Sequence, residues 1–391
     1  MKMRTGNRVR CALVVGTAAV LATACATSSG TGGSGGEGLP GTVKIMSIKE
    51  MTGPVAFAGT HSTRGIDLAV EQINQRKFLG DTKLEIDLHD SAASVQEAAS
   101  FATQAVSDQS YSAILGPAAS SQAAAVSPIA DKAKIPVIYT QAGSDGVLVG
   151  DYTYRVTAPA SSYFHHAGEY LKSKGAKTAA VLYNSGNPTL AELGQETVPQ
   201  LAKKYGFTVS SSDGVQLTAQ DFTNAGAKIA RAKPDAVFVL LQGPQNPAAI
   251  TQLKQNGYSG EIVGMTSMGA GNLKPAGQQA KGTVWPSDFS PHAEVPSVQE
   301  FVKAYQAKYN GELPNNYAAE AYDAAWFLAR GIKEAGSADR TAIQQGLATV
   351  AKQGFEGAEG KLRFEGNDLR VEGVLAGWDG SGEILVSREA S

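Results

Sequence analysis

The chain has 391 residues, a formal charge of −2 at pH 7 and two cysteines. This charge balance argues against a nucleic-acid partner, because phosphate binding requires a basic surface. Both cysteines lie within the first 25 residues, which excludes a disulfide framework or a thiolate metal site elsewhere. Stability must come from apolar burial, for which roughly 350 residues are ample and predict two domains.

The N-terminus has the pattern of a secretion signal. Four basic residues within the first ten precede an apolar run at 11–22. That run is shorter than the ~20 residues needed to cross a bilayer. The following Leu21-Ala22-Thr23-Ala24-Cys25 resembles a lipobox, in which Cys25 becomes the first mature residue and is acylated. Cleavage at an ordinary signal site nearby is the alternative. We expect residues 1–24 to be the signal and residues 25–40 a flexible Gly/Ser-rich tether.

After the tether, segments typical of strands and helices alternate. The first block has predicted strands at 42–48, 83–89, 113–115 and 135–140, and predicted helices at 64–75, 94–108 and from 120 onward. This alternation predicts a doubly wound, mostly parallel α/β sheet. Ligands of such sheets bind beyond the carboxyl ends of the strands. The loops expected at that edge are 49–59, 116–121 and 141–147.

The stretch at 111–125 combines a strand, a tight turn and a helix start. The strand ends at Gly116-Pro117, and an Ala-rich run after Ser120 and Ser121 favours a helix. The first N–H groups of a helix lack intrahelical partners, so this stretch predicts an anion site with a serine hydroxyl as an added donor. The turn contains no Lys or Arg, which favours a small carboxylate over a polyphosphate. In the alternative, Ser120 or Ser121 only caps its own helix.

A second block repeats the alternation. Its predicted strands are 178–183, 208–215, 236–241 and 261–265, and its predicted helices are 163–174, 190–205, 222–232 and 247–256. Three further helices, at 298–309, 317–335 and 340–352, precede strands at 361–364 and 373–379. Two similar α/β blocks with elements appended late predict two lobes between which the chain crosses more than once.

Several short motifs, in their order and spacing, resemble one known family. They are Met51-Thr52-Gly53-Pro54-Val55-Ala56, Gly59, Arg64-Gly65, Leu115-Gly116-Pro117 with Ser120, Tyr154-Arg155, Phe222 and Ala321-Tyr322-Asp323-Ala324. Over nearly the whole mature chain they are similar to the type-I periplasmic binding proteins of the leucine/isoleucine/valine-binding branch. The resemblance implies two Rossmann-like lobes, a three-strand hinge and closure around one small ligand. It also implies delivery to a membrane permease driven by an ATPase on separate chains.

The resemblance assigns the lobes and half of the site. It places residues 41–157 and 289–357 in the N-terminal lobe and residues 158–288 and 358–391 in the C-terminal lobe. Ser120, with Ser121 beside it, matches the serine that holds the ligand carboxylate. Ser144 matches a hydroxyl residue that contacts carboxylate and ammonium, Ala142 a carbonyl that accepts from the ammonium, and Tyr322 a tyrosine of the pocket wall.

The second-lobe half of the site departs from the family pattern. Amino-acid binders place an acid in the loop that here reads Gly264-Met265-Thr266-Ser267-Met268, which leaves Thr266 as the expected contact. Gln242 follows the strand after which a tyrosine is expected, and Phe57 lies near the position of the usual aromatic residue. Burying an ammonium without a counter-charge is unfavourable. A carboxylate ligand that carries no free ammonium is therefore a serious possibility.

Other chemistry has little support. His165 and His166 are adjacent on a predicted helix, so their side chains should point about 100° apart and not form one metal face. The chain contains no Gly-x-Ser-x-Gly elbow and no phosphate-binding loop. We therefore expect no enzyme activity, metal or cofactor, and a monomeric protein. The predicted function is a lipid-anchored solute receptor of an ABC importer. The alternatives are a ligand-sensing surface receptor of the same fold and a binder of non-amino-acid carboxylates.

Overall fold

The computed structural model describes residues 38–53 and 55–386. The predicted signal, the predicted lipid attachment at Cys25 and most of the predicted tether lie outside the described residues. Among the helices within those ranges, none combines the length and the apolar character that crossing a membrane requires.

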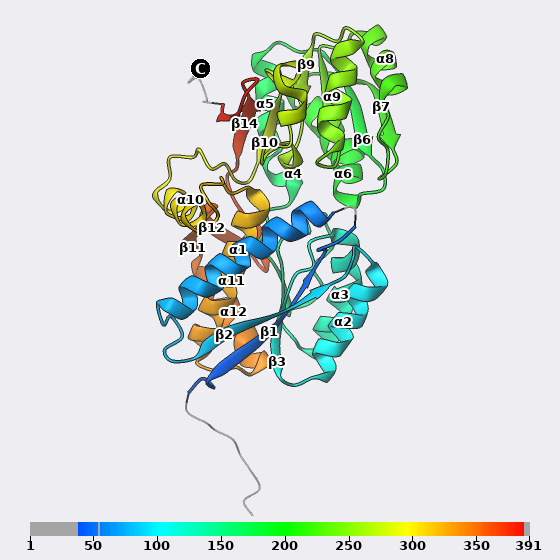
Figure 1. The fold of residues 1–391 in the computed structure, drawn as a ribbon. Coiled ribbons are helices and arrows are strands. Elements are labelled where there is room, and N and C mark those ends of the chain that lie inside the picture. Colours follow the sequence, from blue (N-terminus) through cyan, green and yellow to red (C-terminus); the bar gives the residue numbers. More distant parts are fainter. Residues whose placement is uncertain (1–37, 54, 387–391) are drawn as a thin grey trace, which may run out of the picture. The chain divides into compact units, whose positions relative to one another are not determined.

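The first sheet is built from two separated parts of the chain. Its strands are β1 (Thr42–Lys49), β2 (Lys83–Asp90), β3 (Tyr111–Leu115), β4 (Val137–Tyr139), β5 (Thr153–Arg155), β11 (Phe355–Gly357), β12 (Gly360–Glu365) and β13 (Asp368–Arg370). They lie side by side in the order β11-β12-β13-β5-β4-β3-β1-β2 (Figure 1). β1 to β5 pair in parallel, whereas β11, β12 and β13 pair with one another antiparallel. The expected mostly parallel sheet is confirmed.

Helices cover both faces of this sheet. They are α1 (Ala56–Gln75), α2 (Val95–Ser107), α3 (Ser120–Ala133), α10 (Pro296–Lys308), α11 (Asn316–Ala335) and α12 (Arg340–Gln353). Alternate residues of β1 point to opposite faces. Val43 and Ile45 pack with α1, α11 and α12, whereas Met46 and Ile48 pack with α2 and α3. Because both faces are buried, the strands read as apolar runs rather than strict alternations.

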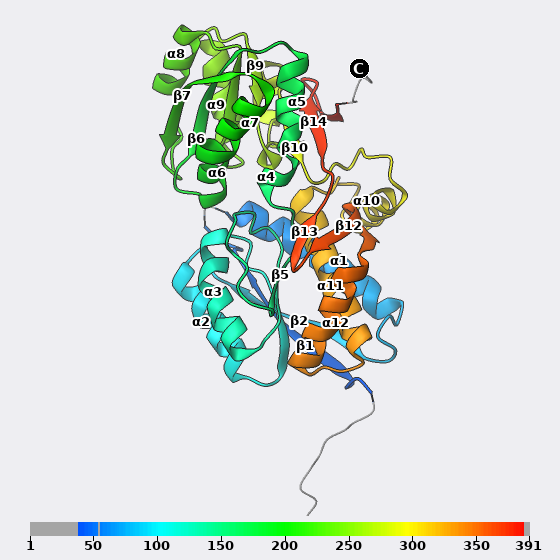
Figure 2. The same ribbon diagram turned by 180° about the vertical axis from the view of Figure 1, so that it is seen from behind.

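The second sheet has seven strands. They are β6 (Thr178–Asn184), β7 (Thr208–Val215), β8 (Ala236–Leu240), β9 (Glu261–Val263), β10 (Val284–Ser287), β14 (Val374–Trp378) and β15 (Glu383–Leu385). Their spatial order is β15-β14-β10-β9-β8-β6-β7 (Figure 2). In this order, β10, β9, β8, β6 and β7 pair in parallel with their neighbours. β14 pairs antiparallel with β10, and β15 pairs antiparallel with β14.

Helices also sandwich the second sheet. They are α4 (Ala160–Tyr163), α5 (His165–Ser173), α6 (Pro188–Glu192), the π-helical turn Leu193–Thr197, α7 (Val198–Tyr205), α8 (Thr223–Ala232), α9 (Gln245–Gln255) and the 3₁₀ turns Thr266–Met268 and Lys274–Ala280. One core joins α4 to α7 to the face of β6 that carries Val181, and the other joins α8 and α9 to the face that carries Leu182. Two such sheets, each with its own helices, confirm the predicted two-lobed α/β fold.

The chain passes between the two sheets three times, after β5, after β10 and after β13 (Figure 2). The last crossing differs from the expected lobe boundary at residue 358. β12 and β13 belong to the first sheet, where Asp368 lies beside Arg155 of β5, and the chain reaches the second sheet only at β14. A strand pattern in the sequence indicates that a segment is extended but not which sheet it joins. The lobe boundary therefore follows only from the pairing of β13 with β5.

Helix α1 starts eight residues before the expected helix at 64–75. Its N-cap residue, Val55, makes no side-chain capping bond, so the usual N-terminal signal is missing. Gly59 lies where a Cβ would be 2.1 Å from the Glu50 carbonyl oxygen, and Gly65 where a Cβ would be 2.1 Å from the Ala318 carbonyl oxygen. These two glycines allow the start of α1 to pack directly on the end of β1 and on α11.

Candidate functional site

The carboxyl ends of strands from both sheets face one small cavity. Its volume is about 110 Å³, somewhat below the ~150 Å³ of a protein cavity that accepts benzene. The lining comes from segments that follow β1, β3, β4, β5, β6, β8 and β9 and from the start of α11. The lining residues are Val55, Ala58, Ala118, Ala119, Gln141, Gly143, Thr157, Ala158, Ala160, Tyr163, Asn187, Thr189, Leu190, Gln242, Met265, Thr266, Ser267, Asn316, Tyr317 and Glu320. The cavity thus lies at the sheet edge that the strand–helix alternation predicts.

The N–H groups of the loop after β3 are already bonded within the protein. The carboxyl group of Glu50, which follows β1, accepts from the Ala119 N–H at 2.9 Å and from the Ala118 N–H at 3.2 Å. Burial raises the pKa of Glu50, and the bonds from these backbone donors oppose that rise. The predicted anion site is therefore filled by an internal acid. The loop sequence carries no sign of this, because the acid comes from a different strand.

Neither serine of this loop caps its helix. Helix α3 begins at Ser120, and its N-cap residue is Ala119, which makes no side-chain capping bond. Ser121 is exposed and is not among the residues that line the cavity. The capping alternative is thus not what the structure shows, and Ser120 is available for a different contact.

Ser120, Ser144 and Thr189 form a cluster of hydroxyl groups across the two sheets. The Thr189 hydroxyl, at the start of α6, lies 3.2 Å from Ser120 Oγ and 2.9 Å from Ser144 Oγ. The Ser144 N–H also donates to Ser120 Oγ at 3.2 Å. Thr189 lines the cavity, whereas the two serines lie directly behind it. The structure therefore brings the two predicted serines together and adds Thr189, which the sequence reasoning missed. Asn187 caps α6 and Pro188 begins it, a pair typical of a helix start that could have pointed to Thr189.

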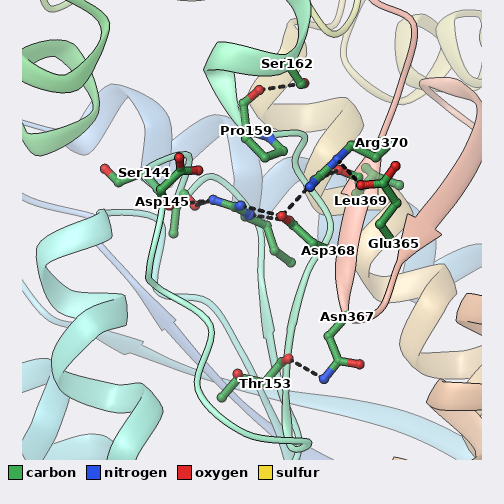
Figure 3. Close-up of polar contacts among 12 residues, drawn as sticks. Ser144, Asp145, Thr153, Pro159, Ser162, Glu365, Asn367, Asp368, Leu369 and Arg370 are labelled. Carbon is green, nitrogen blue, oxygen red and sulfur yellow. Dashed lines mark hydrogen bonds and ion pairs between the residues drawn. The ribbon is translucent and has the colours of Figure 1, made fainter. Parts of the chain in front are cut away.

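Ala142 lies next to a buried guanidinium group. Its carbonyl accepts from Arg155 Nη1 at 3.0 Å, and the Ser144 carbonyl accepts from the same atom at 2.6 Å. Arg155 in turn pairs bidentately with Asp368 of β13 at 2.6 and 2.7 Å. Figure 3 shows Asp368 beside Arg370 and, one residue away, Asn367 beside Thr153. The carbonyl expected to accept from a ligand ammonium thus bonds an arginine, and Arg155 fixes the loop that carries Ser144.

The predicted pocket tyrosine lies elsewhere. The Tyr322 hydroxyl donates to Gln72 Oε1 at 2.7 Å, its ring packs against Phe301, and it is not among the lining residues. Tyr317 lines the cavity instead. The two tyrosines are five positions apart on α11, which turns their side chains about 140° from each other around the helix. Phe57 packs its ring on Tyr317 at a centroid distance of 6.0 Å, behind the cavity wall.

The second sheet lines the cavity with neutral groups. Gln242 and Thr266 both belong to the lining, as the sequence predicts, with Ser267 and Met265 beside Thr266. The Gln242 N–H donates to Gln245 Oε1 at 3.1 Å, which holds the turn after β8. Thr266 begins the 3₁₀ turn that follows β9. No lysine, arginine, histidine or acid lines the cavity from this sheet in the described ranges.

One acid does line the cavity, and it comes from the first sheet's helices. Glu320 lies one turn beyond Asn316 on α11 and accepts from Asn316 Nδ2 at 2.9 Å. Only 2% of its surface is exposed. Burial and the charge of nearby Asp288 raise the pKa of Glu320 well above its usual range. A signal existed in the polar residues at 315, 316 and 320, which stand among apolar residues at the start of α11, but burial of an acid depends on tertiary packing.

A buried lysine lies behind the same wall. Lys49, at the end of β1, is fully buried and donates from Nζ to Thr140 Oγ1 at 2.7 Å. Burial lowers the pKa of Lys49 to about 8, against the influence of Glu50 and Glu320. The chain of hydrogen bonds continues from Thr140 to Gln141 Oε1 and from Gln141 Nε2 to the Tyr317 carbonyl. This network connects the ends of β1 and β4 to the first turn of α11.

His165 and His166 do not point apart as expected. Their ring centroids are 4.1 Å apart, and with Glu169 they offer ligand atoms that lie within 4.8 Å of one another. The His165 ring instead turns back to bond the Ser162 carbonyl through Nδ1. Both nitrogens of His166 face protein oxygens, at the Glu372 carbonyl and at Glu169. We therefore assign no metal to this pair.

Two α/β sheets whose strand ends converge on one small cavity define a two-lobed binding protein. The comparison with family models agrees, since residues 42–376 match the family described as periplasmic binding protein. The chain belongs to the periplasmic binding protein family. Among its relatives, the leucine-, isoleucine-, valine-, threonine- and alanine-binding protein of Pseudomonas aeruginosa is 25% identical over 339 residues, covering 84% of this chain and 87% of that protein.

Solved structures show the same architecture. The branched-chain amino acid substrate-binding protein LivJ from Streptococcus pneumoniae, in complex with isoleucine, is 26% identical with a TM-score of 0.79, and the match covers 88% of this chain and 99% of LivJ. The leucine-binding protein LivK from Thermotoga maritima is 25% identical with the same TM-score of 0.79, and the match covers 88% of this chain and 98% of LivK. The resemblance inferred from short motifs is thereby confirmed.

Proposed function

We propose that this protein is an extracytoplasmic receptor that captures a small amino acid or a related solute and delivers it to an ABC importer. One observation carries the proposal: a small cavity lies where strand ends of both sheets meet, and hydroxyl groups from both sides line or support it. The ligands named for the relatives from Pseudomonas aeruginosa and Streptococcus pneumoniae support an amino acid. The permease and the ATPase are the proposed partners, on separate chains.

A ligand screen tests the proposal directly. A ligand that binds only the folded state stabilises it by ~2.7 kcal/mol at a hundredfold excess over its Kd. We expect at least one of leucine, isoleucine, valine, threonine and alanine to raise the melting temperature of the purified mature protein. Calorimetry should then give one site per chain. If no amino acid, carboxylate or amine shifts the melting temperature, the proposed function is wrong.

Replacing Ser120 by Ala should weaken binding of the amino acid found in that screen. We propose that the hydroxyl cluster of Ser120, Ser144 and Thr189 contacts the ligand carboxylate. Loss of one hydrogen bond to a charged group costs about 1.5–3 kcal/mol, or roughly 10- to 150-fold in Kd. Ser121→Ala is the matched control, because Ser121 is exposed on the next position of α3. Equal affinities of the two variants, measured by calorimetry, would exclude a role for Ser120.

We also propose that the mature protein is held at the membrane by lipid on Cys25. Cys25→Ala should release the protein or leave its signal uncleaved, because Gly/Ser tether residues have no membrane affinity of their own. Cys11→Ala is the control, since Cys11 lies inside the predicted signal and should leave anchoring intact. Labelling with a fatty acid and fractionation of the cells measure both variants. Normal membrane retention of Cys25→Ala would contradict the anchor.

A further inference from the structure

Three buried acids gather near the crossings between the two sheets. Asp288 directly follows β10, Glu320 lies on α11 and Glu359 lies between β11 and β12. Their exposed fractions are 4%, 2% and 9%. Both oxygens of Asp288, both oxygens of Glu359 and Oε2 of Glu320 have no hydrogen-bond partner within the described part of the chain. Native proteins rarely leave so many buried acceptors without donors.

Nearby cations do not balance these acids. Lys49, whose charge interacts with Glu320, donates a side-chain hydrogen bond to Thr140 and lies next to Glu50. Asn316 supplies Glu320 Oε1 with a neutral donor. Burial is the largest cause of the raised pKa of Asp288, of Glu320 and of Glu359, and repulsion by Asp288 adds to it for Glu320 and for Glu359. A cation placed against Glu320 would compensate for the lost hydration of its carboxylate and for the repulsion by Asp288.

Glu320 is the member of this group that reaches the cavity. It belongs to the lining, whereas Asp288 and Glu359 do not. No lysine, arginine or histidine is found among the lining residues described by the structure. An anionic ligand would therefore meet one buried acid and no cationic side chain, while a cationic ligand would meet an unpaired carboxylate oxygen.

The donors for a ligand carboxylate are also limited. The backbone N–H groups of Ala118 and Ala119 are bonded to Glu50, and the hydroxyl cluster around Thr189 is neutral. A carboxylate can thus be held only through neutral hydrogen bonds. The charge of the ligand's cationic end is matched by an acid, and the charge of its anionic end is matched by no side chain of the lining.

We propose that Glu320 Oε2 binds a primary ammonium group of the ligand, so that the site selects a compact organic cation and treats the carboxylate as a secondary contact. The inference rests on the proposed function, because it concerns the same cavity. An ammonium suits the position since it offers three donors, which can bond Glu320 and neighbouring acceptors together. The cavity of about 110 Å³ restricts the ligand to a small one. The acid that the second sheet lacks is thus supplied by α11 of the first.

Matched series of ligands measure the contributions of the ammonium and of the carboxylate separately. Leucine, valine and alanine are each titrated by calorimetry beside the corresponding 2-oxo acid, which lacks the ammonium, and the corresponding amide, which lacks the carboxylate charge. For the amino acid that binds, we expect the oxo acid to bind about 10- to 150-fold more weakly, as for the loss of a charged hydrogen bond. The amide should lose less affinity than the oxo acid, because its carbonyl still accepts from the neutral donors of the hydroxyl cluster.

The variant Glu320→Gln tests the residue itself. It keeps the shape and the bond from Asn316 but removes the charge, so affinity for the amino acid and the amide should fall about 10- to 150-fold while affinity for the oxo acid is kept or improved. Glu356→Gln, at an exposed position, should leave all three affinities unchanged. Thermal melting checks that both variants are folded.

The outcomes distinguish this inference from the proposed function. Binding of an oxo acid as tightly as its amino acid, or an unchanged preference in Glu320→Gln, would overturn the inference and leave a solute receptor in place. Failure of every compound in the series to bind would remove the proposed function and the inference with it. Weak binding of the oxo acid by the wild type, together with loss of that discrimination in Glu320→Gln, would support both.

Discussion

Replacing Arg155 by Met should lower the free energy of unfolding by about 3 kcal/mol, because it removes the bidentate partner of the largely buried Asp368 and leaves only Arg370 beside that carboxylate. Only 3% of the Arg155 side chain and 16% of the Asp368 side chain are exposed. The same change frees the carbonyls of Ala142 and Ser144, which Arg155 holds. We therefore expect ligand affinity to fall together with stability, since Ser144 belongs to the hydroxyl cluster behind the cavity.

Urea unfolding followed by circular dichroism measures this loss. Arg231→Met is the matched control, because Arg231 is exposed on α8 and should change stability by less than about 0.5 kcal/mol. The double variant Arg155→Met/Asp368→Leu should recover part of the loss, as removal of both partners of a buried pair usually does. If Arg155→Met unfolds at the wild-type urea concentration, the ion pair does not join β5 to β13 in the way described.

Replacing Gly65 by Ala should separate α1 from α11. The new Cβ would lie 2.1 Å from the Ala318 carbonyl oxygen, and backbone atoms cannot turn aside as a flexible side chain can. Overpacking costs about 1–3 kcal/mol and occasionally more, whereas the higher helix propensity of Ala returns about 1 kcal/mol. Because the clash is with a backbone atom, we expect an overpacking cost of about 3 kcal/mol. The free energy of unfolding should then fall by about 2 kcal/mol in total.

The effect should reach the cavity, because Ala318 lies between Tyr317 and Glu320 in the first turns of α11. Ligand binding by Gly65→Ala should therefore weaken at temperatures where the variant is still folded. Thr60→Ala, on the exposed side of the same helix, is the control for α1 and should behave as the wild type. Unchanged melting and unchanged affinity of Gly65→Ala would show that the two helices can move apart freely.

The fold could be predicted largely from the sequence, because its strands are apolar and its helices amphipathic. The segment 42–48 differs from β1 by a single residue, and the parallel order of the strands follows from the alternation. The start of α1 could not be predicted, since Val55 carries no capping side chain. Assignment of β12 and β13 to a sheet depends on the pairing of Asp368 with Arg155, which is 213 residues distant in sequence.

The site could be predicted less well. The edge of the sheet, Gln242 and Thr266 followed from strand order and from the family resemblance. Glu320 did not, because an acid within a helix is usually exposed, and only the packing of α11 shows that this one is buried. The family resemblance predicts Tyr322 for the pocket wall, but the rotation of the helix places Tyr317 at the cavity instead.

Glu50 also determines which dissolved ions can interfere with this site. Its carboxyl group bonds the N–H groups of Ala118 and Ala119 from the end of β1, to which it is covalently attached. A tethered group competes at an effective concentration of at least the millimolar order even on a flexible linker. Chloride, phosphate or acetate in the surrounding medium must displace this intramolecular competitor before it can occupy the loop. Glu50 therefore makes the start of α3 less sensitive to the anions of the surrounding medium.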